Sequence, residues 1–394
     1  MPHHRAYLDW NATAPLHPVV RGAVLRALDI TGNPSSIHYE GRRARAAVEE
    51  ARQAVARLVG GDAENVVFTS GATEAASALL RQGLLGCCGN DLPIGMTVLA
   101  GATEHVAVLT AAGFGARLPV DPNGVIVIET VQERLDEVGP ALVAVQLANN
   151  ETGVIQPIRE IADVVHQSGG ALVVDAVQGP GRIPLDMTEL AADALFLSAH
   201  KFGGPKGVGA IVFRDARTRL ASAAIAGGGQ ERGQRGGTEN LIGIIGMGAA
   251  AREVRAGGEV ARDLSHLRDE FESRLNHIAP DVQIVGQGAQ RLANTSLFAL
   301  PGIRAESALV AFDLAGVAVS SGSACSSGKV TASHVLTAMG APEWIGAGAI
   351  RISIGQTTTL EEIEKALVVI ARLVAKRPQI PNLMPGMARN SSAA

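Results

Sequence analysis

Residues 194–201 read Ala-Leu-Phe-Leu-Ser-Ala-His-Lys, four apolar residues followed at once by a serine, a histidine and a lysine. A short apolar run is typical of a buried strand, and the polar residues after it are placed at the carboxyl end of that strand. Similar runs occupy residues 66–68, 97–99, 142–145, 171–174 and 209–213, with helical segments between most of them. The alternation predicts an α/β fold in which helices cover both faces of a mostly parallel sheet.

The segments outside this region divide the chain further. Residues 15–28 and 39–59 have helical spacing, whereas beyond residues 257–258 the pattern changes to a helix over 260–278, shorter strands and a final helix over 360–376. We therefore expect a large domain over residues 13–257 and a smaller α+β domain made of residues 1–12 and 258–376. Residues 377–394 contain three prolines and are predicted to form a loosely ordered tail.

Composition excludes several classes of protein. The net charge of −4 gives no basic field for nucleic acid or anionic lipid, and no apolar run reaches the length of about 20 residues needed to cross a bilayer. The N-terminus lacks the pattern of a signal peptide, and three cysteines cannot build a disulfide framework. We expect a cytoplasmic protein without a metal site, in which Cys87 and Cys88 lie at the end of an apolar helix.

Lysine is scarce in this chain, since only 5 of its 34 Lys and Arg residues are lysines. An arginine stays protonated, whereas a lysine amine shifts its pKa readily and forms a Schiff base with a carbonyl group. The first lysine, Lys201, follows the apolar run quoted above, so it is a candidate for such an amine. The alternative is an ordinary solvated lysine in a loop.

A second strand end supplies the partners for Lys201. The run 171–174 is followed by Asp175 and, three residues later, by Gln178. The run 194–197 is followed by Ser198, His200 and Lys201. Neighbouring strand ends would place all five side chains in one pocket. An Asp beside a Lys fits pyridoxal phosphate, because the carboxylate stabilises the pyridinium and the amine holds the aldehyde. A plain salt bridge remains the alternative.

A phosphate site is predicted independently at Thr69-Ser70-Gly71-Ala72-Thr73-Glu74, which follows a strand and opens a helix. Backbone N–H groups at a helix N-terminus bind anions, and the Thr73 hydroxyl would add a donor beside Ala72. The same residues also read as a capping box. The segment 227–240, rich in Gly and Arg, is interpreted as a loop that approaches a ligand closely.

An ordered series of motifs then resembles the NifS/IscS-like cysteine desulfurases, from about residue 7 to about residue 375. The motifs are Tyr7-Leu8-Asp9 with Asn11-Ala12-Thr13, Gly32 to Ser36, Thr69 to Glu74, Thr103-Glu104-His105, Asn149 to Gly153, Asp175 to Gln178, Ser198 to Lys201, Arg235 to Thr238, and Ser320 to Cys325. The resemblance implies a dimeric pyridoxal-phosphate enzyme of fold type I, with a mostly parallel seven-stranded sheet in its large domain.

The resemblance also implies a role for each site residue. Lys201 would hold the cofactor, Asp175 would pair with its ring nitrogen, Gln178 would bond the ring oxygen and His105 would stack on the ring. Ala72, Thr73, Ser198 and His200 would hold the phosphate, with Thr238 reaching it from the partner subunit. Arg351 would bind the substrate carboxylate, with Asn33 and Asn150 nearby, as suits a planar guanidinium.

Cys325 is expected to decide the reaction. It lies in a loop of small residues, about 320–333, and a thiol in an exposed loop is typical of a reactive group. The predicted function is conversion of L-cysteine to L-alanine with transfer of sulfur to Cys325 as a persulfide. Alternatives are a selenocysteine lyase, a class V aminotransferase, or a sulfur-carrier or scaffold partner without activity. The acceptor of the sulfur, whether an Fe–S scaffold or a protein of tRNA or DNA thiolation, stays open.

Overall fold

The computed structural model describes residues 5–87, 90–92, 94–113, 116–256, 260–322 and 333–377. Its main element is a seven-stranded sheet, in which β10 alone runs antiparallel to its neighbours. The strand order is β2 (Val66–Thr69), β10 (Gly209–Phe213), β9 (Ala194–Ser198), β8 (Ala171–Asp175), β7 (Leu142–Gln146), β5 (Val98–Gly101) and β6 (Arg117–Leu118). The predicted mostly parallel sheet is confirmed. Strand β6 is the one strand of this sheet that does not correspond to an apolar run in the sequence.

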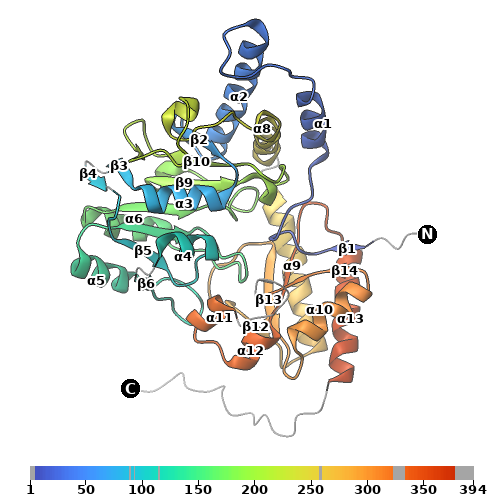
Figure 1. The fold of residues 1–394 in the computed structure, drawn as a ribbon. Helices are drawn as coiled ribbons and strands as arrows, with labels where there is room; N and C mark the ends of the chain where they lie inside the picture. The colour runs from blue at the N-terminus through green and yellow to red at the C-terminus, as the bar shows by residue number, and fades with distance from the viewer. Residues whose placement is uncertain are drawn as a thin grey trace.

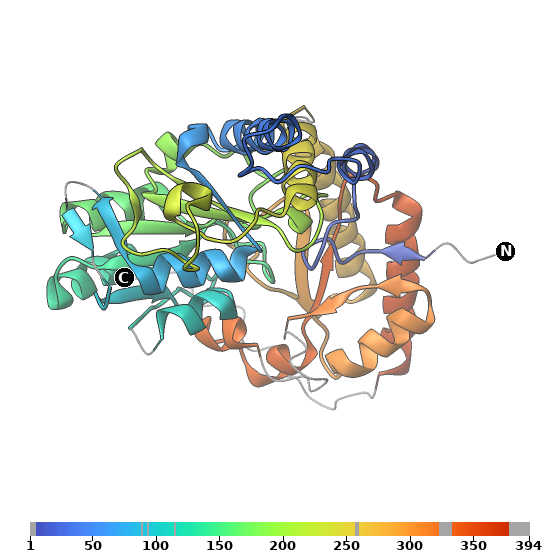
Figure 2. The same ribbon diagram turned by 45° about the horizontal axis from the view of Figure 1, so that its top comes forward.

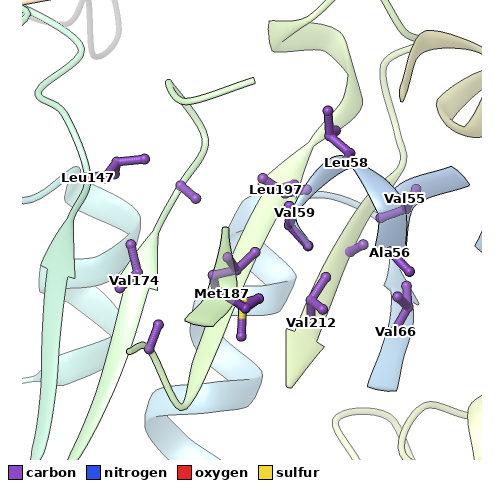
Figure 3. Packing of buried hydrophobic residues seen from close by; sticks show 14 of the residues in the cluster. Val55, Ala56, Leu58, Val59, Val66, Leu147, Val174, Met187, Leu197 and Val212 are labelled. Carbon is purple, nitrogen blue, oxygen red and sulfur yellow. The ribbon is translucent and has the colours of Figure 1, made fainter. Parts of the chain in front are cut away.

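Both faces of this sheet are buried, because alternate residues of each strand enter different clusters. In β9, Leu195 and Leu197 join one cluster and Ala194 and Phe196 the other. The first face carries α1 (Pro18–Ala27), α2 (Tyr39–Leu58), α5 (Ile128–Val138), α6 (Ile158–Gln167), the short α7 (Met187–Leu190) and α8 (Leu241–Ala256) (Figure 1). Figure 3 shows Val174, Leu197 and Val212 of three strands beside Val55 and Val59 from the end of α2.

The opposite face is covered by α3 (Ala72–Gln82), α4 (Val106–Ala112) and a small antiparallel sheet, β11 (Arg219–Leu220), β3 (Leu84–Cys87) and β4 (Asn90–Leu92). The expectation that Cys87 ends an apolar helix is wrong. Helix α3 ends at Gln82, because Gly83 adopts a φ of 77° that stops the helix, and the buried Cys87 lies in β3. Cys88 lies outside the described residues.

A second region is built on a four-stranded antiparallel sheet, β12 (Gln283–Ile284), β13 (Thr295–Ala299), β16 (Ile350–Ser353) and β15 (Ser320–Ser321). Around it lie α9 (Val260–Ile278), α10 (Ala305–Leu314), α11 (His334–Ala338), α12 (Glu343–Gly348) and α13 (Leu360–Lys376). Thr359 begins α13 through a capping box with Glu362. The helices predicted over 260–278 and 360–376 are confirmed. The domain boundaries stay a prediction.

The N-terminal arm, residues 5–14, joins the two regions. Its strand β1 (Ala6–Tyr7) pairs in parallel with β14 (Val317–Ala318), and the Asn11 N–H then donates to Ser353 Oγ over 3.0 Å. Three residues later the Ala14 N–H donates to the carbonyl of His200 over 2.8 Å. The arm therefore runs from the smaller sheet to the segment that carries Lys201 (Figure 2).

The described residues contain neither a candidate membrane span nor a candidate metal cluster. None of their helices has the length and apolar character needed to cross a membrane. Nor do they contain a group of three or more His, Cys, Asp or Glu side chains placed to hold a metal ion.

Candidate active site

A cavity of about 740 Å³ lies beyond the carboxyl ends of β8 and β9, which are adjacent and parallel. Five side chains from these two strand ends line it: Asp175, Gln178, Ser198, His200 and Lys201. The cavity thus occupies the place where open α/β sheets bind ligands. Arg351 of β16 and Asn150 of the β7–α6 connection also line this cavity.

Lys201 projects into this cavity from the short 3₁₀ turn that follows β9. Its Nζ donates to the carbonyl of Asn11 over 2.7 Å and to that of Ala12 over 3.0 Å. Burial and the nearby guanidinium groups of Arg182 and Arg351 lower the pKa of Lys201 to about 8. A substantial fraction of the amine is therefore neutral near physiological pH, as a nucleophile or proton acceptor requires.

Asp175, the last residue of β8, is the carboxylate that shares the cavity wall with the Lys201 strand end. Its Oδ1 accepts from the Val177 N–H over 3.0 Å, and burial raises the pKa of Asp175 to about 6. Glu104 is wholly buried beside it, and burial together with the charge of Asp175 raises the pKa of Glu104 well above its ordinary value. Asp175 therefore carries a negative charge at neutral pH, whereas the environment of Glu104 favours its protonated form.

The far end of the cavity suits an anion. Ala72 and Thr73 line it at the N-terminus of α3, where the N-cap residue Gly71 supplies no side-chain acceptor for the first N–H groups. His200 lines the same cavity, with its Nδ1 3.1 Å from Thr13 Oγ1. Burial and the charges of Lys201 and Lys206 lower the pKa of His200 to about 4, so the ring is neutral.

Arg351 is the cation that faces the remaining side of the cavity. Its Nη1 donates to the carbonyl of Asn150 over 2.9 Å and its Nη2 to Asp9 Oδ1 over 2.6 Å. Its Nε is buried and has no hydrogen-bond partner among the described residues. An unsatisfied buried guanidinium N–H is costly, so a ligand with acceptor oxygens is expected at this position.

The comparison with known proteins agrees with this geometry. Residues 6–366 match the family model described as Aminotransferase class-V. The chain belongs to the class-V aminotransferases. A cysteine desulfurase of Cereibacter sphaeroides is 39% identical over 380 residues, which cover 94% of this chain and 96% of that protein. The cysteine desulfurase IscS of Dictyoglomus turgidum is 38% identical, with 94% of each chain covered.

A solved structure of similar architecture is that of a NifS-like protein from Rickettsia africae. Its TM-score is 0.85 at 31% identity, and the match covers 94% of this class-V aminotransferase and all of the other chain. The resemblance to the NifS/IscS-like group and the fold type I architecture are both confirmed.

The cofactor of this family is pyridoxal phosphate, and the residues of the cavity fit it. Lys201 offers an amine whose pKa is lowered to about 8, Asp175 a buried carboxylate without an ion-pair partner among the described residues, and α3 an anion site. Gln178 is buried, and its Oε1 has no hydrogen-bond partner in the part of the chain that the structure describes. Each of these groups would gain a partner from a pyridine aldehyde that carries a phosphate.

Two of the described residues predicted for the site do not line the large cavity of this class-V aminotransferase. Asn33 is exposed in the turn before α2, where its Oδ1 accepts from the Ser35 N–H, and it does not line the cavity. Thr238 lines a smaller cavity of about 200 Å³, which shares Ser70 and Gly207 with the large one. Cys325 lies outside the described residues.

His105 lines the cavity as predicted. It caps α4, because its Nδ1 accepts from the Ala107 N–H over 3.1 Å, and burial with the charge of Lys201 lowers its pKa. The ring is therefore neutral at physiological pH, with its Nδ1 already engaged.

Sequence reasoning missed several groups that the structure places in or beside the cavity: Asp9, Asn11, Glu104, Gln146, Glu151, Arg182 and Lys206. Asp9, Asn11, Glu104 and Glu151 stand inside motifs that carried the resemblance. Their contacts come from segments far apart in the chain, so no local pattern could assign them a role.

Proposed function

We propose that this class-V aminotransferase is a cysteine desulfurase, which converts L-cysteine to L-alanine and transfers the sulfur to Cys325 as a persulfide. The observation that supports it most strongly is the pairing of Lys201 and Arg351 in one cavity. An amine for the reacting carbon and a guanidinium for the carboxylate are the two groups that an amino acid substrate needs.

The proposal gives a part to each of the predicted site residues. Arg351 binds the substrate carboxylate, with Asn150 beside it, and Asn33 contributes to substrate binding in the assembled enzyme. Lys201 anchors the cofactor covalently and then moves the proton at the substrate Cα. Asp175 pairs with the ring nitrogen, Gln178 bonds the ring oxygen and His105 stacks on the ring. Pyridoxal phosphate supplies an electron sink for the bonds at Cα.

The phosphate is held by the N–H groups at Ala72 and Thr73 and by Ser198 and His200. Thr238 reaches it from the second subunit of a homodimer. The division into a domain of residues 13–257 and a smaller one of 1–12 and 258–376 is part of the same proposal.

The sulfur transfer balances without an external oxidant. The Cys325 thiolate attacks the substrate sulfur, the bond between that sulfur and the substrate Cβ breaks, and its electron pair remains on the carbon skeleton, which is protonated to alanine. The persulfide on Cys325 is then passed to an acceptor. We propose an acceptor protein in the cytoplasm, such as a scaffold of Fe–S cluster assembly.

The decisive experiment supplies the purified holoenzyme with L-cysteine and measures alanine, sulfide in the presence of dithiothreitol, and the mass of the peptide that contains Cys325. With dithiothreitol we expect alanine and sulfide in equal amounts. Without dithiothreitol we expect a mass gain of one sulfur atom on that peptide. Cys325→Ala is expected to bind the cofactor normally and to release no sulfide. Sulfide release by this variant would overturn the role of Cys325. Amino-group transfer to a 2-oxo acid in place of desulfuration would overturn the proposed reaction.

A further inference from the structure

Four consecutive residues of the N-terminal arm accept hydrogen bonds from three cationic side chains. Arg351 Nη2 donates to the Asp9 carboxylate, and Arg182 Nη2 lies 3.5 Å from the carbonyl of Trp10. Lys201 Nζ donates to the carbonyls of the next two residues along the arm. Cations of β16, of the loop after β8 and of the turn after β9 thus contact the arm. Asp9 is the one acidic residue among residues 5–14.

Among the described residues, Arg182, like Lys201, donates only to main-chain carbonyls. It is buried, and its hydrogen bonds go to the main-chain carbonyls of Gln178, Trp10 and Lys201, at 3.1, 3.5 and 3.2 Å. Within the described ranges it forms no ion pair with a carboxylate. Burying a cation against neutral acceptors alone costs free energy, and a neutral side chain of similar size would avoid that cost. Its presence therefore calls for a reason other than stability.

The position of Arg182 separates it from the substrate. It lines a second cavity, of about 400 Å³, on the other side of Lys201 and does not line the large one. Glu253 also lines the second cavity, but its Oε2 lies 3.9 Å from His17 Nδ1. Burial and the charge of Arg351 lower the pKa of Arg182 to about 10, so it remains a cation at neutral pH.

The charges that face Lys201 come from several elements. Asp175 of β8 and Asp9 of the arm are negative, whereas Arg351 of β16 and Arg182 are positive. His105 and His200 also face it, and both rings are neutral at physiological pH. When a substrate carboxylate binds Arg351, its negative charge offsets much of the effect of the Arg351 charge on the Lys201 amine. Arg182 has no access to substrate, so its field on the Lys201 amine persists throughout turnover.

We propose that Arg182 is a positioning residue that acts through Lys201: its permanent charge favours the neutral, proton-accepting form of the Lys201 amine, and its bond to the Lys201 carbonyl fixes the backbone from which that amine projects. The inference rests on the proposed role of Lys201 as the reacting amine.

The test measures the pKa of the Lys201 amine without turnover. Full-length apoprotein of the wild type, Arg182→Gln and Arg182→Lys is treated with trinitrobenzenesulfonate over a pH series, and the labelled Lys201 peptide is quantified by mass spectrometry. We expect Arg182→Gln to raise the pKa of Lys201 by about one unit, which is about a ten-fold loss of neutral amine at neutral pH. Arg182→Lys keeps the charge and is expected to stay close to the wild type. The absorbance of each substrate-free holoenzyme over the same pH series gives a second readout.

Arg159→Gln is the matched control, because it removes an arginine charge from the exposed face of α6, where Arg159 pairs with Asp163. It is expected to leave the pKa of Lys201 unchanged. An unchanged pKa in Arg182→Gln, or equal shifts in Arg182→Gln and Arg159→Gln, would overturn the proposal. Should Arg182→Gln fail to fold, a wild-type pKa of Lys201 close to that of free lysine, or a shift in Arg182→Lys as large as one unit, would overturn it equally. None of these outcomes depends on sulfur transfer, so loss of desulfurase activity and failure of this inference are distinguishable.

Discussion

Arg351 Nη2 donates to Asp9 Oδ1 over 2.6 Å, although 342 residues separate the two in sequence. The pair joins the N-terminal arm to β16 at the edge of the large cavity, and both side chains are largely buried. Asp9 therefore holds the guanidinium that we assign to the substrate carboxylate.

Asp9→Ala is expected to raise KM for L-cysteine about ten-fold with little change in kcat, because a charge-assisted hydrogen bond that orients Arg351 is lost. Asp9→Asn retains an acceptor oxygen, so its KM is expected to lie between those of Asp9→Ala and the wild type. Steady-state kinetics measure both. Asp313→Ala is the control, since Asp313 pairs with Arg5 of the same arm at the exposed surface. Equal KM values for Asp9→Ala and the wild type would contradict the orienting role of Asp9.

Lys201→Ala is expected to abolish covalent attachment of the cofactor and to lower kcat by at least about 100-fold, because the proton-transfer group is removed. Borohydride reduction followed by mass spectrometry shows the attachment directly. Lys206→Ala serves as control, since Lys206 lines the same cavity and should leave the reduced adduct on Lys201. An adduct on Lys206 in the wild type would reverse this assignment.

Glu151 is expected to make the free energy of unfolding decrease as the pH rises. It is buried, its Oε2 accepts from Ser333 Oγ over 2.7 Å, and burial raises its pKa from 4.5 to about 7. The folded state keeps the proton where the unfolded state loses it, so this contribution is fully present below about pH 4.5 and is lost as pH rises through about 7.

Glu151→Gln removes that titration. Relative to this variant, the wild type is expected to lose on the order of 2–3 kcal/mol of unfolding free energy between pH 4.5 and 7.5, at about 1.4 kcal/mol for each unit of pKa. Urea unfolding of both apoproteins across this range measures the difference. Parallel pH profiles would show that Glu151 ionises in the folded protein as it does in the unfolded chain.

Gly209→Ala is expected to weaken cofactor binding about ten-fold or more. A Cβ at residue 209 would lie 2.6 Å from the Leu197 carbonyl oxygen and 2.8 Å from Gly71 Cα, so the turn before α3 must shift. Gly346→Ala is the control, because a Cβ there meets no atom within 4 Å and alanine favours the helix α12. Fluorescence titration with pyridoxal phosphate gives the affinities, and equal values for the two variants would contradict the close approach.

The fold was predictable where sequence periodicity is strong. Six strands of the large sheet are buried on both faces, so each forms an apolar run. Asp175 and Lys201 are found because polar residues follow two of these runs. Strand β6 has only two residues and no period, and the end of α3 depends on the φ of Gly83. Neither strand β6 nor the end of α3 can therefore be predicted from the spacing of apolar residues.

The site was predictable only in part, because its electrostatics depend on tertiary contacts. The chemical type of Lys201 and its place after a strand identify the amine, but the acceptors of its hydrogen bonds are main-chain oxygens of residues 11 and 12, which any sequence supplies. Arg182 is likewise recognisable as important only once its burial beside the Lys201 carbonyl is known.

The N-terminal arm also sets an order of events during synthesis. Residues 5–14 leave the ribosome early, whereas the residues that hold them, Gly316, Ala318 and Ser353, are made hundreds of residues later. A nascent chain can form the large sheet and present Lys201 before the carbonyls of Asn11 and Ala12 are fixed around its amine. Capture of the cofactor in its final geometry must therefore follow synthesis of β16, which makes it a step of completed chains rather than of growing ones.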